Sequence, residues 1–203
     1  MSRAPKTVCL AWTGASGLPY GMRLLECLLG AGCRVQLVYS QAAQVVARQE
    51  MDFELPSRPA EARALLLERF PGLPGTLDVY GREEWFAPMA SGSGVPDAMV
   101  VCPCTMGALG AIANGLSDNL LERAADVVLK EGRTLVLVPR ETPLSAIHLE
   151  NMLRLARAGA VILPPNPGFY ARPQSLSDLI DFIVARILDR IDVPQALLGR
   201  WGE

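Results

Sequence analysis

Residues 8–29 read VCLAWTGASGLPYGMRLLECLL, an apolar run joined to an amphipathic one by the small residues GASG at 14–17. The apolar run predicts a buried strand, and residues 20–29 have the apolar spacing of a helix. A strand, a small-residue turn and a helix in this order are typical of phosphate-binding sites, because backbone N–H groups at a helix start attract anions. The stretch lacks the G-x-G-x-x-G spacing of dinucleotide sites, and an ordinary tight turn is the alternative interpretation.

Apolar runs and amphipathic segments alternate along the rest of the chain. Runs that are apolar throughout, each followed by a helical pattern, predict a parallel sheet with helices on both faces. Half of the 203 residues are hydrophobic, which suits one well-filled domain over residues 1–203. We expect strands at residues 7–13, 34–39, 98–102, 134–139 and 160–163, and helices at residues 20–29, from about 41, 58–69, 106–113, 120–130, 146–158 and 176–188.

The charge and the cysteine content exclude several classes of protein. A net charge of −2 does not provide the basic face that nucleic-acid binding requires. No apolar run is long enough to span a bilayer. Five cysteines, an odd number in apolar segments, favour buried thiols in a reducing compartment over a disulfide framework. Cys102-Pro103-Cys104 lacks the paired spacing of a zinc site. We therefore expect a cytoplasmic protein with no metal, nucleic-acid or membrane partner.

Small and polar residues follow three of the expected strands. Ser40 comes directly after the second strand, the segment PCTMGALG (103–110) after the third, and Arg140-Glu141 after the fourth. The carboxyl ends of parallel strands share one edge of the sheet, where open α/β sheets bind their ligands. The alternatives are a helix cap at Ser40 and close helix packing at 103–110. Together these turns predict a nucleotide-like or phosphate-bearing ligand, for which Arg140 is a suitable partner.

Three further charged residues are candidates for a site: Glu50, Arg123 and Lys130. For Lys130 the alternative is a surface ion pair with Asp126, four residues earlier on the same expected helix. The proline-rich loop 164–173 carries two aromatic residues, and aromatic residues on such loops often line a pocket. From residue types and spacing alone, the interpretation ends at an α/β protein that binds a phosphate-bearing ligand.

Five longer motifs occur in a fixed order along the chain. They are TGASG-x-PYG-x-RLLE, PCTMGALGAIANGLSDNLLERAADVVLKE, LVLVPRETPL, GAVILPPNPGFYARPQSLSDLIDFIVARILD and the closing RWG. In this order they closely resemble the UbiX-type flavin prenyltransferases, from about residue 8 to residue 202, with the loosest match at residues 55–87. AWTGASG stands where the family usually has GISGASG, which places Trp12 and Thr13 before the small-residue turn.

This resemblance implies a flavodoxin-like Rossmann sandwich of three layers with a mainly parallel sheet, assembled as a homododecamer. It implies FMN as the bound flavin and as the acceptor of a prenyl group. The implied reaction transfers a dimethylallyl group from dimethylallyl monophosphate to N5 and C6 of reduced FMN. The prenylated FMN then serves a UbiD-type decarboxylase as its cofactor. The family has itself long been described as decarboxylases.

The resemblance also implies roles for individual residues, which come from more than one subunit of the assembly. Trp201 is implied at an interface or a flavin edge, and residues 90–93 near the site. The residues implied around FMN are Gly14, Ala15, Ser16, Ser40, Thr105, Met106, Gly107, Ala108 and Arg140. Those implied at the prenyl phosphate are Tyr170, Arg186, Lys130 and Arg123, with Glu141 in the same cluster and Glu50 as a carboxylate near the reacting flavin.

The expected chemistry accounts for these residue types. An allylic phosphate leaves by ionisation, so cationic side chains must neutralise the departing charge. They can do so without a metal, and the chain has no D-D-x-x-D carboxylate cluster that magnesium would need. The proton of flavin N5 can pass to Glu50, Glu141 or the released phosphate, with Ser16 as a relay. The expected catalytic set is therefore Ser16, Glu50, Lys130 and Glu141.

Two other functions agree with parts of this pattern. The first is a non-catalytic protein that binds or delivers FMN, but FMN alone does not require so many cationic residues. The second is a flavin-dependent cysteine decarboxylase of the same superfamily, whose chemistry expects a histidine early in the chain. The single histidine here is His148.

Overall fold

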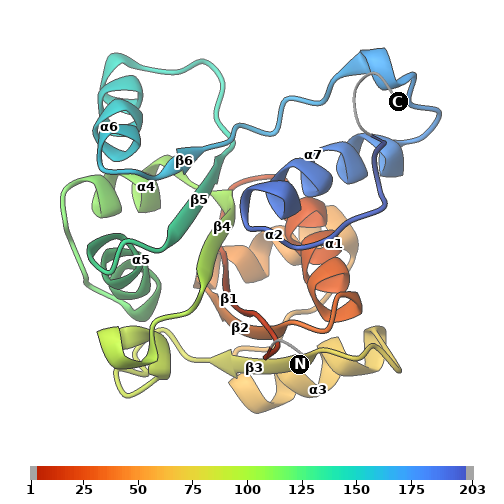
Figure 1. The fold of residues 1–203 in the computed structure, drawn as a ribbon, viewed down its shortest axis with the longest axis horizontal. Coiled ribbons are helices and arrows are strands. Elements are labelled where there is room, and N and C mark those ends of the chain that lie inside the picture. The colour runs from red at the N-terminus through yellow and green to blue at the C-terminus, as the bar shows by residue number, and fades with distance from the viewer. Residues whose placement is uncertain (1–3, 200–203) are drawn as a thin grey trace.

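The computed structural model describes residues 4–199, and its centre is a six-stranded sheet in which all neighbouring strands are parallel (Figure 1). The strands are β1 (Thr7–Trp12), β2 (Arg34–Tyr39), β3 (Thr76–Tyr80), β4 (Ala98–Cys104), β5 (Thr134–Pro139) and β6 (Val161–Ile162). Their order across the sheet is β3-β2-β1-β4-β5-β6. The chain therefore builds outward from β1 in one direction, returns to the middle and builds the other way from β4. The switch between β1 and β4 is where such sheets bind ligands.

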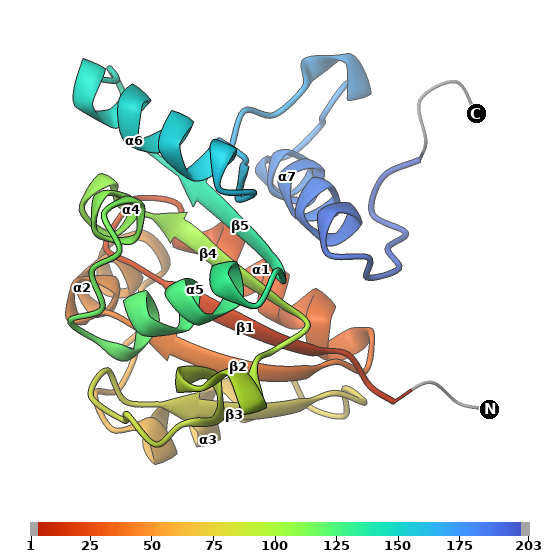
Figure 2. The same ribbon diagram turned by 60° about the vertical axis from the view of Figure 1, so that its left-hand side comes forward.

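Helices cover both faces of this sheet and complete the expected three layers (Figure 1, Figure 2). One face carries α1 (Leu18–Gly30), α2 (Gln41–Met51), α3 (Pro59–Arg69) and α7 (Leu176–Arg190). The other carries α4 (Met106–Ala113), α5 (Leu120–Lys130) and α6 (Ala146–Arg157). The loops contain the short 3₁₀ turns η1 (Pro88–Ala90), η2 (Gly92–Gly94) and η3 (Phe169–Ala171). Within residues 4–199, no helix is long and apolar enough to cross a bilayer.

The sequence pattern missed one strand, β3, at the edge of the sheet. Its residues alternate: Leu77 and Val79 are buried in the core, whereas Asp78 accepts hydrogen bonds from Arg34 on the neighbouring β2. A strand that buries one face has this period of two, and the other strands were predicted from continuous apolar runs. The structure also corrects the bounds of three strands, because β1 ends at Trp12, β4 continues to Cys104 and β6 has two residues.

Side-chain caps fix where several helices begin. Ser40 caps α2 and Thr105 caps α4, each hydroxyl accepting the backbone N–H three residues further on, at 3.2 and 3.1 Å. Ser175 and Asp178 form a capping pair at the start of α7, since each accepts the other's backbone N–H. These bonds satisfy donors that a helix start otherwise leaves without a partner.

The apolar side chains of α7 are only partly buried in the single chain. Ile183, Val184, Ile187 and Leu188 are at most 1% exposed and lie in the same core as α1. Leu176, the first residue of the helix, is 71% exposed. The start of α7 therefore presents a hydrophobic side chain at the surface of one chain.

Thr13 ties the ends of β1 and β4 together at the switch point. Its hydroxyl donates to the Pro103 carbonyl at 2.8 Å and accepts the Thr105 N–H at 2.8 Å. Its own N–H donates to the same Pro103 carbonyl at 3.2 Å. Thr13 is 3% exposed, so these bonds are shielded from competing water. They set the position of the turn after β1 relative to the start of α4.

All five cysteines are free. Burial raises the pKa of the Cys9 and Cys104 thiols to about 12, and it also raises the pKa of Cys102. These thiols therefore stay protonated and unreactive at neutral pH. Among the described residues, no group of His, Cys, Asp and Glu side chains is arranged to hold a metal ion.

Helix α1 packs against the sheet at a glycine. A Cβ on Gly21 would lie 2.4 Å from the Cys102 carbonyl oxygen and 2.7 Å from Nε1 of Trp12. Trp12 is fully buried at the end of β1, and its Nε1 has no hydrogen-bond partner among the described residues. The glycine thus lets the helix approach both the strand backbone and a large rigid ring.

We predict that Gly21→Ala lowers the free energy of unfolding by about 1–3 kcal/mol, because the new methyl group overlaps with a backbone atom and the indole. Gly30→Ala is the matched control in the same helix, since a Cβ there meets no atom within 4 Å. It should leave stability unchanged or raise it, because alanine is the better helix former. Urea unfolding followed by circular dichroism measures both variants. Equal midpoints would show that α1 can move away from the sheet without losing stability.

Candidate functional site

A cavity of about 220 Å³ lies at the switch point of the sheet. Three helices begin beside it, and the N-cap residue of each lines it: Ser40 for α2, Thr105 for α4 and Asn119 for α5. Thr13 and Gly14 line it from the end of β1. Because the N-terminal ends of helices carry partial positive charge, the cavity is suited to an anion.

Backbone donors remain available around this cavity. The first two N–H groups of α2, at Gln41 and Ala42, have no acceptor within residues 4–199, and the same holds for Met106 and Gly107 in α4. The capping hydroxyls take only the third N–H of each helix. The oxygens of a phosphate in the cavity could accept hydrogen bonds from these N–H groups. Unpaired N–H groups at helix starts bind phosphates in other folds as well.

Gly14 brings the end of β1 close to the first turn of α2. A Cβ on Gly14 would lie 2.3 Å from the Cβ of Ala42. The small-residue turn is therefore required at this point for close approach. The next two residues differ in burial, because Ala15 is 6% exposed and Ser16 lies at the surface.

The start of α1 already holds an anion, the carboxylate of Glu50. Its oxygens accept the N–H of Gly17 at 2.9 and 3.1 Å and the N–H of Leu18 at 3.0 Å. Gly17 has no side chain to cap α1, so this residue from the last turn of α2 supplies the cap. The chain itself thus fills the helix start that follows the GASG turn. The helix starts open to a ligand are those of α2 and α4.

Arg140 and Glu141 follow β5 directly and are exposed at the same edge of the sheet. Arg140 Nε donates to the Ser16 carbonyl at 3.4 Å, which joins the turn after β5 to the turn after β1. Glu141 accepts the N–H of its neighbour Thr142 at 3.3 Å. The structure therefore brings Ser16, Arg140, Glu141 and the capping Glu50 to one side of the cavity.

Arg123 and Lys130 lie on α5, which runs back from the carboxyl edge of the sheet to its amino edge (Figure 2). Lys130 ends the helix just before β5 begins, so it lies at the amino edge. The length of the six-residue β5, about 20 Å at 3.3 Å per residue, separates Lys130 from Arg140. One chain therefore does not bring Lys130 to its own switch-point cavity.

The two cations of α5 lie beside the segment that was expected near the site. Arg123 Nε donates to the Ala90 carbonyl at 3.0 Å. Lys130 and Glu131 lie against Gly92, where an added Cβ would be 3.3 Å from Lys130 Nζ. This α5 cluster, Arg123 in the first turn and Lys130 at the end of the helix with residues 90–92 beside them, is a second group of predicted site residues.

The ion pair between Asp126 and Lys130, the alternative interpretation of that lysine, is not formed. Asp126 pairs instead with Arg123, three residues earlier on the same helix, at 2.8 Å. Lys130 instead pairs with Glu131 and lowers the pKa of that carboxyl. The Lys130 side chain is 46% exposed. Exposed pairs of this kind are weak, so the contact does not prevent Lys130 from binding a phosphate.

Tyr170 and Arg186 belong neither to the group at the carboxyl edge nor to the α5 cluster. Tyr170, in η3, is 59% exposed and packs edge-on against Phe182 of α7, with 5.7 Å between ring centroids. Arg186, also in α7, approaches Asp189 at 3.5 Å. Neither residue lines the switch-point cavity. Trp201 lies outside the described residues.

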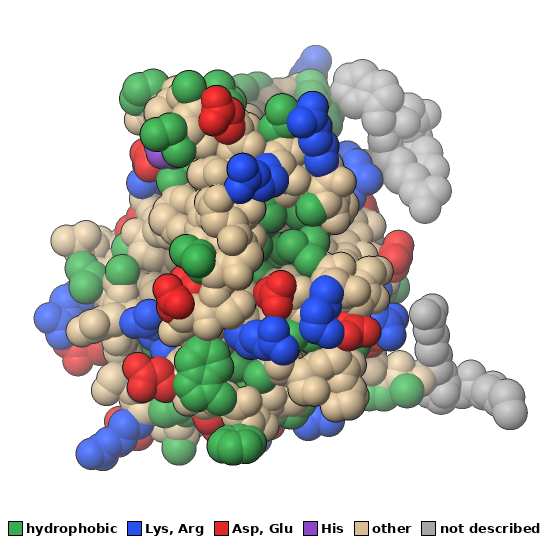
Figure 3. Space-filling view, turned by 90° about the vertical axis from the view of Figure 1, so that its left-hand side faces the viewer, with side chains coloured by type: hydrophobic (Ala, Val, Ile, Leu, Met, Phe, Trp, Pro, Cys, Tyr) green, Lys and Arg blue, Asp and Glu red, His purple; other side chains and the backbone are tan. Residues whose placement is uncertain are grey.

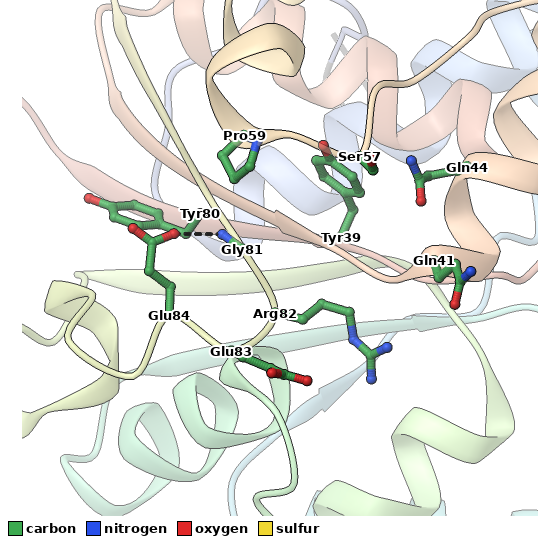
Figure 4. Close-up of a pocket in the computed structure, with 10 residues that line it drawn as sticks. All are labelled: Tyr39, Gln41, Gln44, Ser57, Pro59, Tyr80, Gly81, Arg82, Glu83 and Glu84. Atoms are coloured by element: carbon green, nitrogen blue, oxygen red, sulfur yellow. Dashed lines mark hydrogen bonds between the residues drawn. The ribbon is translucent and has the colours of Figure 1, made fainter.

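Sequence reasoning missed several residues that line the cavity, among them Asn119 and Arg82. Asn119 directly precedes a predicted helix, and an asparagine there is a recognised N-cap signal. Arg82 follows β3, so missing that strand removed any reason to place Arg82 at the ligand edge. Arg82 and Tyr39 also line a larger cavity of about 520 Å³ (Figure 4).

Comparison with known proteins identifies the family. Residues 1–188 match the Flavoprotein family model. The flavin prenyltransferase UbiX of Pseudomonas aeruginosa is 55% identical to this chain, over 98% of this chain and 95% of its own length. This chain belongs to the UbiX flavin prenyltransferase family.

Two solved structures of UbiX proteins are similar over nearly the whole chain. AnUbiX in complex with FMN and dimethylallyl pyrophosphate has a TM-score of 0.87 and 42% identity, with 98% of each chain covered. A dodecameric FMN-dependent UbiX-like decarboxylase from Escherichia coli O157:H7 has a TM-score of 0.85 and 39% identity, with 97% of this chain and 100% of that chain covered.

The family assignment confirms the resemblance carried by the five motifs and the three-layer α/β fold. The alternative of a cysteine decarboxylase loses its support, because the relative at 55% identity is a flavin prenyltransferase. The name of the Escherichia coli protein retains the older description of the UbiX family as decarboxylases.

We predict that Glu50→Gln lowers the free energy of unfolding by about 1 kcal/mol, because it removes the negative charge that caps α1. Glu54→Gln is the matched control: Glu54 is an exposed carboxylate that pairs with Arg48 on the surface, and its loss should change stability by less than about 0.5 kcal/mol. Urea denaturation measures both. If the two variants unfold alike, the Glu50 carboxylate does not stabilise the helix start.

Proposed function

We propose that this chain binds FMN with its phosphate in the switch-point cavity. The residues present fit such a group: Ser40 and Thr105 place two open helix starts there, and Gly14 lets the end of β1 approach the first turn of α2 beside them. Ala15, Ser16 and Arg140 extend the binding surface along the edge of the sheet. The observation that carries the proposal is this cavity of unpaired backbone donors, in a chain of the UbiX family.

The proposed reaction transfers a dimethylallyl group from dimethylallyl monophosphate to FMN without a metal. Reduced FMN would supply two positions: N5 would bond to C1 of the prenyl group as the C1–O bond to phosphate breaks and the N5 proton leaves. C6 would then bond to C3 as a proton adds to C2 and the C6 proton leaves. This chain's residues hold the donor, stabilise the leaving phosphate and accept a proton. The AnUbiX structure contains dimethylallyl pyrophosphate, which supports a prenyl phosphate as the donor. We propose the monophosphate as the donor for this chain.

Cationic side chains are proposed to stabilise the phosphate as its bond to C1 breaks. Arg140 supplies one charge from the carboxyl edge of the sheet. Arg123 and Lys130 supply two more from the α5 cluster of another subunit, with Arg186 from the C-terminal helix. Fixed positive charges aimed at a leaving group lower the barrier most where water is excluded. Tyr170 can stabilise the allylic cation through the face of its ring.

A carboxylate near the flavin is proposed to accept the N5 proton. Glu50 and Glu141 both lie at the carboxyl edge, on the side where Ser16 and Arg140 meet. Ser16 is exposed and can relay a proton between them. General base catalysis of this kind contributes about 10²–10⁴-fold to a rate.

The two separated groups of residues support a site shared between subunits. A related UbiX-like protein is a dodecamer. The surface of this chain has apolar side chains on α6 that an interface would bury, and Figure 3 shows hydrophobic side chains gathered over this helix. Leu144, Ile147, Leu149 and Leu153 are between 41% and 69% exposed. We propose a homododecamer that delivers prenylated FMN to a UbiD-type decarboxylase.

The direct test is an anaerobic incubation of the protein with reduced FMN and dimethylallyl monophosphate, followed by mass spectrometry of the extracted flavin. We expect a gain of one five-carbon prenyl unit without added metal and with a chelator present. Lys130→Ala should reduce the yield by about 10²-fold or more, because a leaving-group charge is lost. Unmodified FMN, tightly bound, would overturn prenyl transfer and leave a flavin-binding protein.

A mixed assembly tests whether the site is shared. Co-expressing Glu50→Gln and Lys130→Ala chains with different tags should restore activity at roughly a quarter of the sites, because random assembly pairs two unaltered residues there. Glu50→Gln mixed with Arg140→Gln is the matched control, since both residues lie at the carboxyl edge of one chain. This control mixture should be no more active than assemblies of either variant alone. An equally inactive first mixture would show that Glu50 and Lys130 of one chain serve one site.

A further inference from the structure

Arg82 is the charged residue whose side chain lies between the two cavities at the carboxyl edge. It lines both the 220 Å³ switch-point cavity and the 520 Å³ cavity over the ends of β2 and β3. Figure 4 shows its side chain extending from the loop after β3 toward the side of Gln41, the first residue of α2. Its guanidinium therefore approaches the helix start whose backbone donors are unpaired.

The Arg82 guanidinium has no hydrogen bond or ion pair with any described residue. Other arginines close to this part of the chain do have partners: Arg34 binds Asp78, Arg63 binds the Leu77 carbonyl and Arg58 binds Glu61. A guanidinium carries five donors in a planar fork that matches a phosphate. The Arg82 guanidinium lies beside a cavity at which helices begin, and it is thus available to bind an anionic ligand.

The backbone of Arg82 is fixed even though its side chain is exposed. Its carbonyl accepts the N–H of Leu120, the first residue of α5, at 2.7 Å. The neighbouring Gly81 N–H donates to the Glu84 carboxylate at 2.7 Å. These bonds hold the loop at the start of α5 and do not involve the guanidinium. A substitution of the Arg82 side chain therefore leaves the loop's anchoring contacts in place.

The carboxylates around Arg82 do not neutralise it. Glu122 also lines the switch-point cavity, but its carboxylate accepts the Asp118 N–H at 2.9 Å. Glu84 is directed at Gly81. Glu83 lies next to Arg82 in the wall of the larger cavity, and its carboxylate has no partner among the described residues. Removal of the Glu83 charge should therefore favour an anion without breaking a contact that holds the loop.

We propose that Arg82 binds the 5′-phosphate of the flavin and sets the preference of this chain for FMN over riboflavin. The proposal rests on the proposed FMN site and adds a side-chain contact to its backbone donors. Arg82 has no role in prenyl transfer: it lies at the phosphate end of the cavity and acts on binding. Charge-assisted bonds from a guanidinium to a phosphate are among the strong hydrogen bonds in proteins.

The test compares two ligands that differ only in the phosphate. Flavin-free protein is titrated with FMN and with riboflavin, and the quenching of flavin fluorescence gives both dissociation constants. We expect Arg82→Gln to lower the ratio of the riboflavin constant to the FMN constant by about tenfold. The dissociation constant of riboflavin should stay the same. Arg82→Lys should give a ratio between those of the unaltered chain and Arg82→Gln. Added salt should weaken FMN binding to the unaltered chain more than to Arg82→Gln.

Two matched variants exclude a general effect of charge. Arg157→Gln removes one positive charge from the exposed end of α6 and should leave the ratio unchanged. Glu83→Gln removes the adjacent negative charge and should raise the ratio or leave it unaltered. An unchanged ratio in Arg82→Gln would overturn the proposal, as would an equal loss of riboflavin binding, which would indicate a role in loop structure. If FMN binds as proposed but no prenyl group is transferred, only the proposed reaction fails.

Discussion

The hydroxyl of Thr13 makes two bonds at once, donating to the Pro103 carbonyl and accepting the Thr105 N–H. These bonds join the last residues of β1 and β4, which the chain reaches some ninety positions apart. The paired register of β1 and β4 ends at Ala11 and Val101, so the Thr13 bonds extend the connection between these neighbouring strands to the carboxyl edge of the sheet. The positions of Gly14, of the α4 start and hence of the anion cavity all depend on it.

Three helix starts at this edge illustrate two uses of the same electrostatics. The start of α1 is satisfied permanently by the Glu50 carboxylate, which comes from the same chain. The starts of α2 and α4 have only their third N–H capped by a hydroxyl, so two donors remain on each. The chain thus leaves two helix starts open to a ligand anion and closes the third with its own carboxylate, that of Glu50.

The sequence predicted the elements whose patterns depend only on local chemistry. Continuous apolar runs identified the inner strands, and the helical pattern expected from residue 176 agrees with the start of α7 at Leu176. The edge strand β3 was missed because it buries one face only, and Arg82 was missed with it. The GASG turn pointed to α1 as the phosphate-binding helix. That interpretation could not foresee that Glu50, more than thirty residues away, caps this helix, because spacing along the chain carries no information on such a contact.

The length of β5 has a consequence for assembly that no single residue reveals. On the proposed division of the site, one chain offers its carboxyl edge to a neighbour and its amino edge to another, so the two contacting surfaces differ. Such heterologous contacts close as a ring only if the rotation between copies divides a full turn. Every subunit would then be both a donor and a recipient of catalytic groups. An inactivating change in one copy would impair its neighbour, and a dissociated monomer would keep its fold and its flavin cavity while losing turnover.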